Sequence, residues 1–268
     1  MNDVILFRVL PVVLGVGIPF VGTLLGAACV FLARRPLRLN MRRGMMAFSA
    51  GVMVAAAVWS LLIPSIDASK LLETWAPVPP VAGFWLGVLL LFAIDKLTPH
   101  LHLGENVPEG PQVALSRSAK IALAVTIHNI PEGMAIGVVF AGWLADSSVA
   151  PVALSAAIAV SVGIAIQNFP EGAIISLPLR AEGASRKKAF SLGLVSAVAE
   201  ALAAIVTLLL SQLLIPVLPW LLALAAGAMV YVVVEELLPE ASTGAHFDGA
   251  TLLFAVGFSM MMVLDTVL

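Results

Sequence analysis

The chain has 268 residues, of which 61% are hydrophobic and only 11% are charged, and its formal net charge is −2. A soluble domain of this length needs far more polar residues to cover its surface, so this composition excludes one. The net charge says nothing useful about partners, because the charges are segregated along the chain, and we expect no nucleic acid partner. The single cysteine, Cys29, excludes an internal disulfide framework and a metal site built on a cysteine pair.

Long apolar runs recur along the chain, and short polar or proline-bearing segments separate them. A helix needs about 20 apolar residues to cross the hydrocarbon core of a bilayer. We therefore expect an all-α integral membrane protein with about eight transmembrane helices in a single domain covering residues 1–268. The first run is expected to be a span rather than a removed signal peptide, because no clear small-residue cleavage site follows it. The predicted spans are 9–33, 45–66, 81–98, 119–143, 150–179, 188–212, 216–239 and 249–268.

The basic residues are distributed unevenly between the loops. All 14 Lys and Arg residues except Arg8 and Lys70 lie in or beside the first, third and fifth loops. Short loops rich in Lys and Arg stay on the cytoplasmic side of a membrane. We therefore place these loops, including the segment 99–118, in the cytoplasm and both termini outside it, in a multi-pass protein of the cell (inner) membrane.

A repeat links the fourth and fifth predicted spans. Residues 128–133 read HNIPEG and residues 167–172 read QNFPEG. Because consecutive spans run in opposite directions, the two copies are antiparallel. Inverted repeats with interrupted helices that meet at the middle of the bilayer are a recurring architecture of transporter sites. Pro131 and Pro170 each lack a backbone N–H and should bend their helices.

These motifs place polar side chains near the middle of apolar spans. Residues three and four apart lie on one face of a helix, so each motif presents its polar residues together. Ionisable groups at this depth cost about 2.5 kcal/mol or more each, yet no Lys or Arg lies inside these spans beyond Lys120 and Lys188 at their ends. The predicted set consists of His128, Asn129 and Glu132, of Gln167, Asn168 and Glu171, and of Glu200 in the sixth span.

A bound cation would compensate for this buried charge. Imidazole nitrogen together with carboxylate and amide oxygens suits zinc and its first-row neighbours, whereas calcium and magnesium prefer oxygen alone. The plainer interpretation, proline kinks with polar helix-packing residues, fits an isolated Asn or Gln better than two matched sets on adjacent spans. The sequence therefore predicts a site for a divalent transition metal.

The paired motifs resemble those of a known family of metal transporters. HNIPEGMAIG at 128–137 and IQNFPEGAIISLPLR at 166–180 are similar to the fourth and fifth spans of the ZIP (Zrt/Irt-like protein) family, in its bacterial branch with P-E-G in both motifs. The resemblance extends over the whole chain. It implies uptake of zinc towards the cytoplasm, with cadmium, iron and manganese as further substrates, by an elevator-like carrier that requires no cofactor and often forms a homodimer.

The resemblance also implies two neighbouring metal positions. The first would be formed by His128, Glu132, Gln167 and Glu171. The second would use Asn129, Asn168 and Glu200, with the two motif glutamates bridging both positions. Some relatives with two metals carry Asp at the position of Asn168, and here three carboxylates face the four positive charges of two divalent ions. We therefore expect the second ion to bind more weakly.

The same carboxylates predict a link between metal ions and protons. Burial and like charge both disfavour three ionised carboxylates in one place. Entry of a metal ion should therefore displace protons, and transport should be accompanied by proton movement.

Other polar residues lie near the ends of the predicted spans. They form an outer pair that could make an acidic entrance, an inner acidic group that could receive released metal, and loop histidines that could relay or sense metal. Each set also has a plainer interpretation as solvated helix ends or loop residues. The sets are Asp67 and Asp265, then Glu235, Glu236 and Glu240, then His100 and His102. Asp95 beside Lys96 is most simply a charge pair, and Met53 is a candidate lining residue.

Two other functions compete with metal uptake. A cation exchanger of another inverted-repeat family, coupled to sodium or calcium, would also use Asn and acidic residues at broken helices, but His128 adds little to a hard-cation site. An intramembrane metalloenzyme would need H-E-x-x-H or a comparable set with an open coordination position. No H-E-x-x-H occurs in the chain, so the sequence favours a transporter and not an enzyme.

Overall fold

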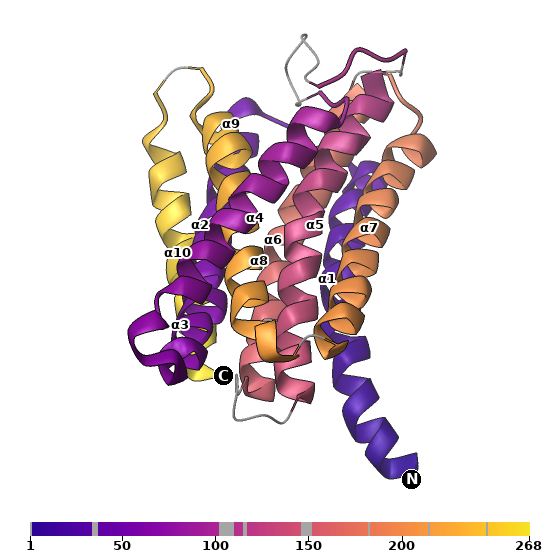
Figure 1. Ribbon diagram of the computed structural model, residues 1–268. Coiled ribbons are helices and arrows are strands. Elements are labelled where there is room, and N and C mark those ends of the chain that lie inside the picture. The colour runs from indigo at the N-terminus through magenta and orange to yellow at the C-terminus, as the bar shows by residue number, and fades with distance from the viewer. Residues whose placement is uncertain are drawn as a thin grey trace.

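The computed structural model of the chain describes residues 2–33, 37–101, 110–114, 117–145, 152–181, 183–213, 215–244 and 246–268. Their regular structure is helical, and the long helices run side by side along one common direction (Figure 1). The elements in chain order are α1 (Asn2–Leu32), α2 (Leu39–Ala56), η1 (Ala57–Leu62), α3 (Ile63–Ser69), η2 (Lys70–Trp75), α4 (Val78–Leu97), α5 (Arg117–Leu144), α6 (Leu154–Ala181), α7 (Arg186–Leu213), η3 (Ile215–Val217), α8 (Leu218–Val232), η4 (Val233–Leu237), α9 (Leu238–Ser242) and α10 (Asp248–Val267).

Most of these helices are long enough and apolar enough to cross a membrane. Seven candidate spans occur within the described residues. α5 is as long as α6 and α7, with 28 residues, and it carries the HNIPEG motif in its middle. At 1.5 Å per residue such a helix is about 42 Å long, which exceeds the hydrocarbon thickness of about 30 Å. The expectation of an all-α, multi-span membrane protein is confirmed.

The observed bounds differ from the predicted spans mainly at helix ends. α1 begins at Asn2 rather than near residue 9, and the second predicted span lies in a helical run that continues from Leu39 to Ser69. Helices can extend beyond a bilayer, so these bounds do not set where the membrane begins. The predicted spans therefore stay predictions as membrane boundaries.

The helices divide into two units. α1, α5, α6 and α7 pack on one another and form the first unit. In the second unit α2 packs on α10 and α4 packs on α8, while α3 and α9 continue the runs of α2 and α8. The main contacts between the units join α5 to α8 and α2 to α6. Both sequence motifs therefore lie in the first unit, on helices that also face the second.

The first unit has an internal two-fold relationship, which two glycines make visible. A Cβ on Gly133 would lie 2.3 Å from the Glu200 carbonyl oxygen and 2.9 Å from the amide nitrogen four residues further on. A Cβ on Gly172 would lie 2.2 Å from the Thr23 carbonyl oxygen and 2.8 Å from the amide nitrogen four residues after it. Only glycine allows such close backbone approach. The α6–α1 pair therefore repeats the α5–α7 pair, and Thr23 occupies the position that Glu200 occupies in the other copy.

The repeat continues in the second unit. Residues 47–54 in α2 read AFSAGVMV, and residues 223–230 in α8 read ALAAGAMV. Each stretch leads into a π-helix, η1 or η4, and a proline follows each π-helix, Pro64 or Pro239. Single π-helical turns are uncommon and occur often at functional sites. The inverted relationship seen between the two PEG motifs thus relates α1–α4 to α7–α10 as well.

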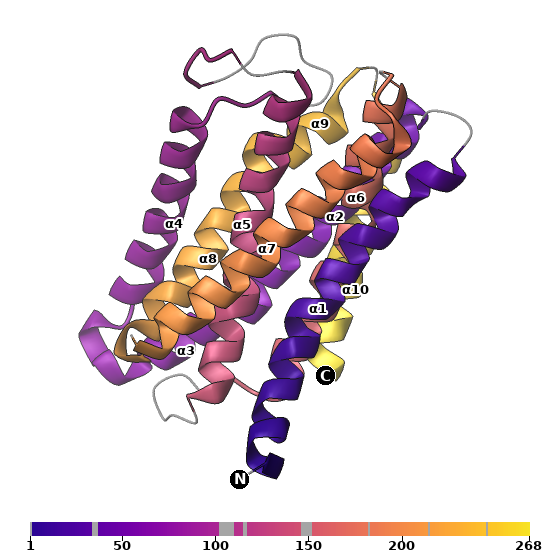
Figure 2. The same cartoon turned by 90° about the vertical axis from the view of Figure 1, so that its right-hand side faces the viewer.

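The two ends of the helical bundle differ in charge. α1 begins and α10 ends at one end of the bundle, which is also the end where α3 lies (Figures 1 and 2). At the opposite end lie the start of α2, the ends of α4 and α6 and the start of α7 (Figure 2). These segments carry Arg42, Lys96, Arg180 and Arg186. We call this the basic end of the bundle.

Candidate metal site

Seven polar residues gather inside the first unit, on helices that are otherwise largely apolar. Because α5, α6 and α7 pack on one another, their polar middles meet. Five of the seven side chains are buried, and His128 and Glu171 are half-buried. These residues, which we call the polar cluster, are His128, Asn129 and Glu132 of α5, Gln167, Asn168 and Glu171 of α6, and Glu200 of α7.

A short hydrogen bond joins the two sequence motifs. Gln167 Nε2 of α6 donates to Glu132 Oε1 of α5 at 2.6 Å. Ser49 Oγ of α2 donates to the backbone carbonyl of Gln167 at 3.3 Å, so the second unit also reaches this point. The amide that the sequence predicts as a metal ligand therefore lies directly beside a predicted carboxylate.

Glu200 joins the cluster from α7. Asn168 Nδ2 donates to Glu200 Oε2 at 2.7 Å, and Asn129 Nδ2 approaches the same oxygen at 3.5 Å. Thr23 of α1 is buried, and its Oγ1 donates to the carbonyl oxygen of Pro19 at 3.3 Å, which Asn168 Nδ2 also approaches at 3.5 Å. Sequence reasoning missed Thr23, and its only signal is its place opposite Gly172, which corresponds to the place of Glu200 opposite Gly133.

Five oxygen atoms of the polar cluster are buried and accept no hydrogen bond. Buried polar atoms are almost always hydrogen-bonded, so several exceptions in one place need an explanation. A buried carboxylate without a partner is costly, and a cation is the partner that would satisfy it. From residue 121 to residue 179 the chain has no Lys or Arg to serve as that cation. The five atoms are Glu132 Oε2, Gln167 Oε1, Asn168 Oδ1, Glu171 Oε1 and Glu200 Oε1.

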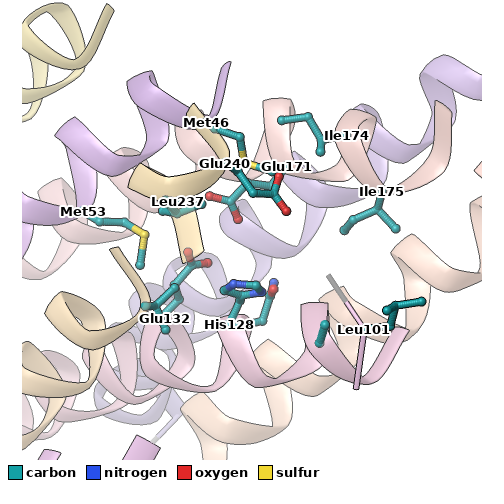
Figure 3. A pocket seen from close by; sticks show the side chains of 13 residues that line it. Met46, Met53, Leu101, His128, Glu132, Glu171, Ile174, Ile175, Leu237 and Glu240 are labelled. Carbon is teal, nitrogen blue, oxygen red and sulfur yellow. The ribbon is translucent and has the colours of Figure 1, made fainter. Parts of the chain in front are cut away.

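A cavity of about 50 Å³ opens beside the polar cluster. A single water needs about 10–15 Å³, so an ion with part of its hydration fits. Figure 3 shows His128 and Glu132 on one side of the cavity and Glu171 and Glu240 on the other. Met53 lines the cavity, as predicted, and Met46, which carries no sequence signal of its own, lines it too.

His128 is directed to a neighbour outside the cluster. Its Nε2 contacts Glu236 Oε2 of η4, in the second unit. As the side chains stand, no group of three or more His, Cys, Asp or Glu within the described parts of the chain could hold a metal ion. A metal site in this cluster would therefore depend on its amide oxygens and on rotation of His128, and the ligand set stays a prediction.

The three glutamates at the end of the seventh span have different surroundings. Glu235 is exposed, whereas Glu236 is buried against His128. Glu240 of α9 lines the cavity, and its Oε2 lies 2.8 Å from Arg42 Nη2 of α2. The structure thus brings two of the three near the polar cluster. Sequence reasoning missed Arg42, because it lies 198 positions from Glu240.

His100 is buried rather than exposed in a loop. Its Nε2 lies 3.0 Å from Asp95 Oδ1, and its Nδ1 lies 2.8 Å from the Thr98 carbonyl oxygen. Lys96 Nζ lies 3.7 Å from Asp95, so the predicted charge pair is present, but His100 is the closer neighbour. The role predicted for His100 stays a prediction, and His102 lies outside the described residues.

The outer pair lies at the end opposite the basic end. Asp67 is exposed and its Oδ1 lies 2.6 Å from Lys70 Nζ, as in an ordinary solvated helix end. Asp265 Oδ1 accepts a hydrogen bond from Ser60 Oγ of η1 at 2.7 Å. The two carboxylates therefore have separate partners, and a joint role as an entrance stays a prediction.

Comparison with known proteins gives matches along most of the chain. A family model described as "ZIP Zinc transporter" matches residues 102–265. The human protein "Zinc transporter ZIP11" is 32% identical over 321 residues, which cover 91% of this chain and 93% of that protein. "Zinc transporter ZIPB" of Bordetella bronchiseptica is 37% identical over 267 residues, covering 96% of this chain and 81% of that protein. "Zinc transporter ZupT" of Chlorobium phaeovibrioides is 39% identical over 220 residues, covering 74% and 76%.

Proposed function

This chain belongs to the ZIP zinc transporter family, and on that premise we propose that it carries divalent transition metal ions, zinc foremost, across a membrane through the polar cluster. The metal ion is the substrate, and the cluster is where the ion is held during its passage. Cadmium, iron and manganese are proposed as further substrates, and a homodimer as the assembled form.

One observation carries this proposal. Five buried oxygen atoms accept no hydrogen bond, and they come from the two motif helices, α5 and α6, and from α7. They belong to three carboxylates and two amides, and a divalent cation is the ligand whose charge and coordination demand fit them together. Gln167 would turn its amide so that Oε1 faces the ion, a rotation that exchanges two atoms of similar size.

The remaining donors favour a transition metal over a hard cation. His128 supplies imidazole nitrogen, and Met46 and Met53 supply sulfur at the wall of the cavity. Soft and borderline donors of this kind select zinc and its neighbours, whereas calcium and magnesium prefer oxygen ligands alone. The names of the relatives, all zinc transporters, support the same choice of metal.

We place the basic end of the bundle in the cytoplasm and propose uptake in that direction, in the inner membrane of a cell. The support is the positive-inside rule, since Arg42, Lys96, Arg180 and Arg186 all lie at this end. Because the three carboxylates lie close together without a basic residue among them, we also propose that an entering ion displaces protons.

Uptake of zinc into proteoliposomes tests the proposal. Wild-type protein should take up zinc, and Glu132→Gln and Glu171→Gln should lose at least about 90% of the rate, since each removes a charged ligand while keeping the shape of the side chain. Glu73→Gln is the control, because Glu73 is an exposed carboxylate outside the first unit. Full zinc uptake by both cluster variants would overturn the proposal, and uptake of calcium in place of zinc would favour the cation exchanger.

A further inference from the structure

The cavity that begins at the polar cluster reaches a second charged pair at the basic end. Glu240 lines this cavity together with His128, Glu132 and Glu171. Its carboxylate is held by Arg42, with Nη2 and Oε2 2.8 Å apart. Both side chains are largely removed from solvent, at 19% and 17% exposure, so the pair is more than a loose surface contact. The wall of the cavity thus includes a carboxylate that already has a cation beside it.

The charge of Arg42 is unfavourable for its own helix. Arg42 lies in the first turns of α2, where the helix dipole favours negative rather than positive side chains. The neighbouring Arg43 has a structural task, since it is buried, donates to the Ala241 carbonyl oxygen at 3.0 Å and lies over the Phe247 ring. Arg42 instead pairs with Glu240, a residue that lines the cavity.

The internal repeat shows what stands in the corresponding place at the other end. Glu240 directly follows Pro239, and its counterpart Ser65 directly follows Pro64. Ser65 Oγ donates to the carbonyl oxygen of Pro219, at the start of α8, at 2.6 Å. The start of α8 corresponds to the start of α2, so one end of the fold uses an ion pair where the other uses a neutral hydrogen bond. Of these two corresponding positions, the one at the basic end carries the charge.

We propose that Arg42 is a release residue, whose guanidinium occupies Glu240 and so prevents this carboxylate from holding the transported ion at the basic end. This inference rests on the proposed function, since it concerns the same ion and the same cavity. A Glu240 carboxylate without Arg42 would act as a third free acid on the cavity wall, beside Glu132 and Glu171, and would compete with water for the departing ion. With Arg42 in place, the ion meets a carboxylate that is already neutralised, and it continues into solution.

Three variants separate release from a purely structural role. Arg42→Met leaves Glu240 without its guanidinium, so zinc should bind about tenfold more tightly, because a charge-assisted competitor is gone. Zinc uptake into proteoliposomes should slow by about fivefold or more for the same reason. Arg42→Met combined with Glu240→Gln removes the carboxylate as well and should return the uptake rate to within about twofold of wild type. Arg42→Lys keeps the charge and should stay close to wild type.

Arg180→Met is the matched control, because Arg180 also lies at the basic end and donates to a backbone carbonyl, that of Ala184, rather than to a carboxylate within the described residues. Wild-type zinc uptake and its loss in Glu132→Gln are measured in the same vesicles, so failure of the proposed function is seen there. The inference is overturned if Arg42→Met transports and binds zinc like wild type. It is also overturned if the double variant is as slow as Arg42→Met, since the pair would then only hold α2 against α9.

Discussion

Replacing Asn168 with Asp tests the charge balance of the polar cluster. The Asn168 amide donates to Glu200 Oε2 at 2.7 Å, so the substitution puts a second carboxylate oxygen in place of a donor. The lost hydrogen bond to a charged group is worth about 1.5–3 kcal/mol. Two charges about 4 Å apart repel by about 4 kcal/mol at an effective dielectric constant of 20. Protonation of one carboxylate relieves part of this repulsion, so we expect the metal-free variant to be less stable by about 3 kcal/mol.

With zinc present the sign of the effect reverses. The variant has four carboxylates in the cluster, which match the four positive charges of two divalent ions. We expect the second zinc ion to bind at least about tenfold more tightly than in the wild type, which corresponds to about 1.4 kcal/mol. Zinc should also raise the Tm of the variant by more than it raises the Tm of the wild type, because the ion binds only the folded protein.

Thermal unfolding in detergent with and without zinc measures the stability difference, and titration calorimetry measures the two affinities. Asn129→Asp is the matched control, because its amide lies 3.5 Å from the same Glu200 oxygen and should lose less metal-free stability. If Asn168→Asp leaves both the metal-free stability and the second affinity unchanged, the charge count of the cluster does not govern how many ions it holds.

Two further predictions follow from the repeat and from its asymmetry. His128→Gln makes the two motifs alike in their polar residues and removes imidazole nitrogen, so zinc uptake should fall relative to manganese uptake by about tenfold; an unchanged ratio in a competition assay would show that His128 does not select the metal. Gly172→Ala places a Cβ 2.2 Å from a carbonyl oxygen of α1 and should destabilise the protein by about 1–3 kcal/mol. Thermal unfolding measures this loss. Gly17→Ala is the control, because its Cβ meets no atom within 4 Å and the protein should keep its stability.

The parts of the site that sequence reasoning found depend on short-range patterns. His128, Asn129 and Glu132 lie within one and a half turns of a helix, and so do the three residues of the second motif, so helical periodicity alone puts each set on one face. The all-α, multi-span class could be predicted from the apolar runs, because the length of an apolar run is also a short-range pattern. What brought the two sets together was the inverted copy of the motif, which implied that the two helices meet.

The parts that sequence reasoning missed depend on contacts between distant residues. Arg42 and Glu240 are 198 positions apart, and neither belongs to a recognisable motif. His100 is only five positions from Asp95, but the turn that buries it over the end of α4 leaves no periodic signal. The extension of the repeat to α1 and α7 was hidden because Thr23 and Glu200 are chemically unlike. Only the matched backbone approach of Gly172 and Gly133 makes their equivalence visible.

The repeat gives the fold two ends of the same architecture, and the differences between the copies give those ends different chemistry. Glu200 stands where the other copy has Thr23, so the polar cluster has an acid from α7 and none from α1. The Arg42–Glu240 pair stands where the other copy has the Ser65–Pro219 hydrogen bond, so the basic end has an ion pair at this position. Such differences change how tightly each state of a carrier holds its ion, but they cannot by themselves move an ion against its gradient, because affinity and conformational free energy are linked around a closed cycle. We therefore expect the proposed release residue to raise the rate of transport in the direction that the gradient sets. In vesicles with equal zinc on both sides, Arg42→Met should slow the exchange of labelled zinc and leave the final distribution unchanged.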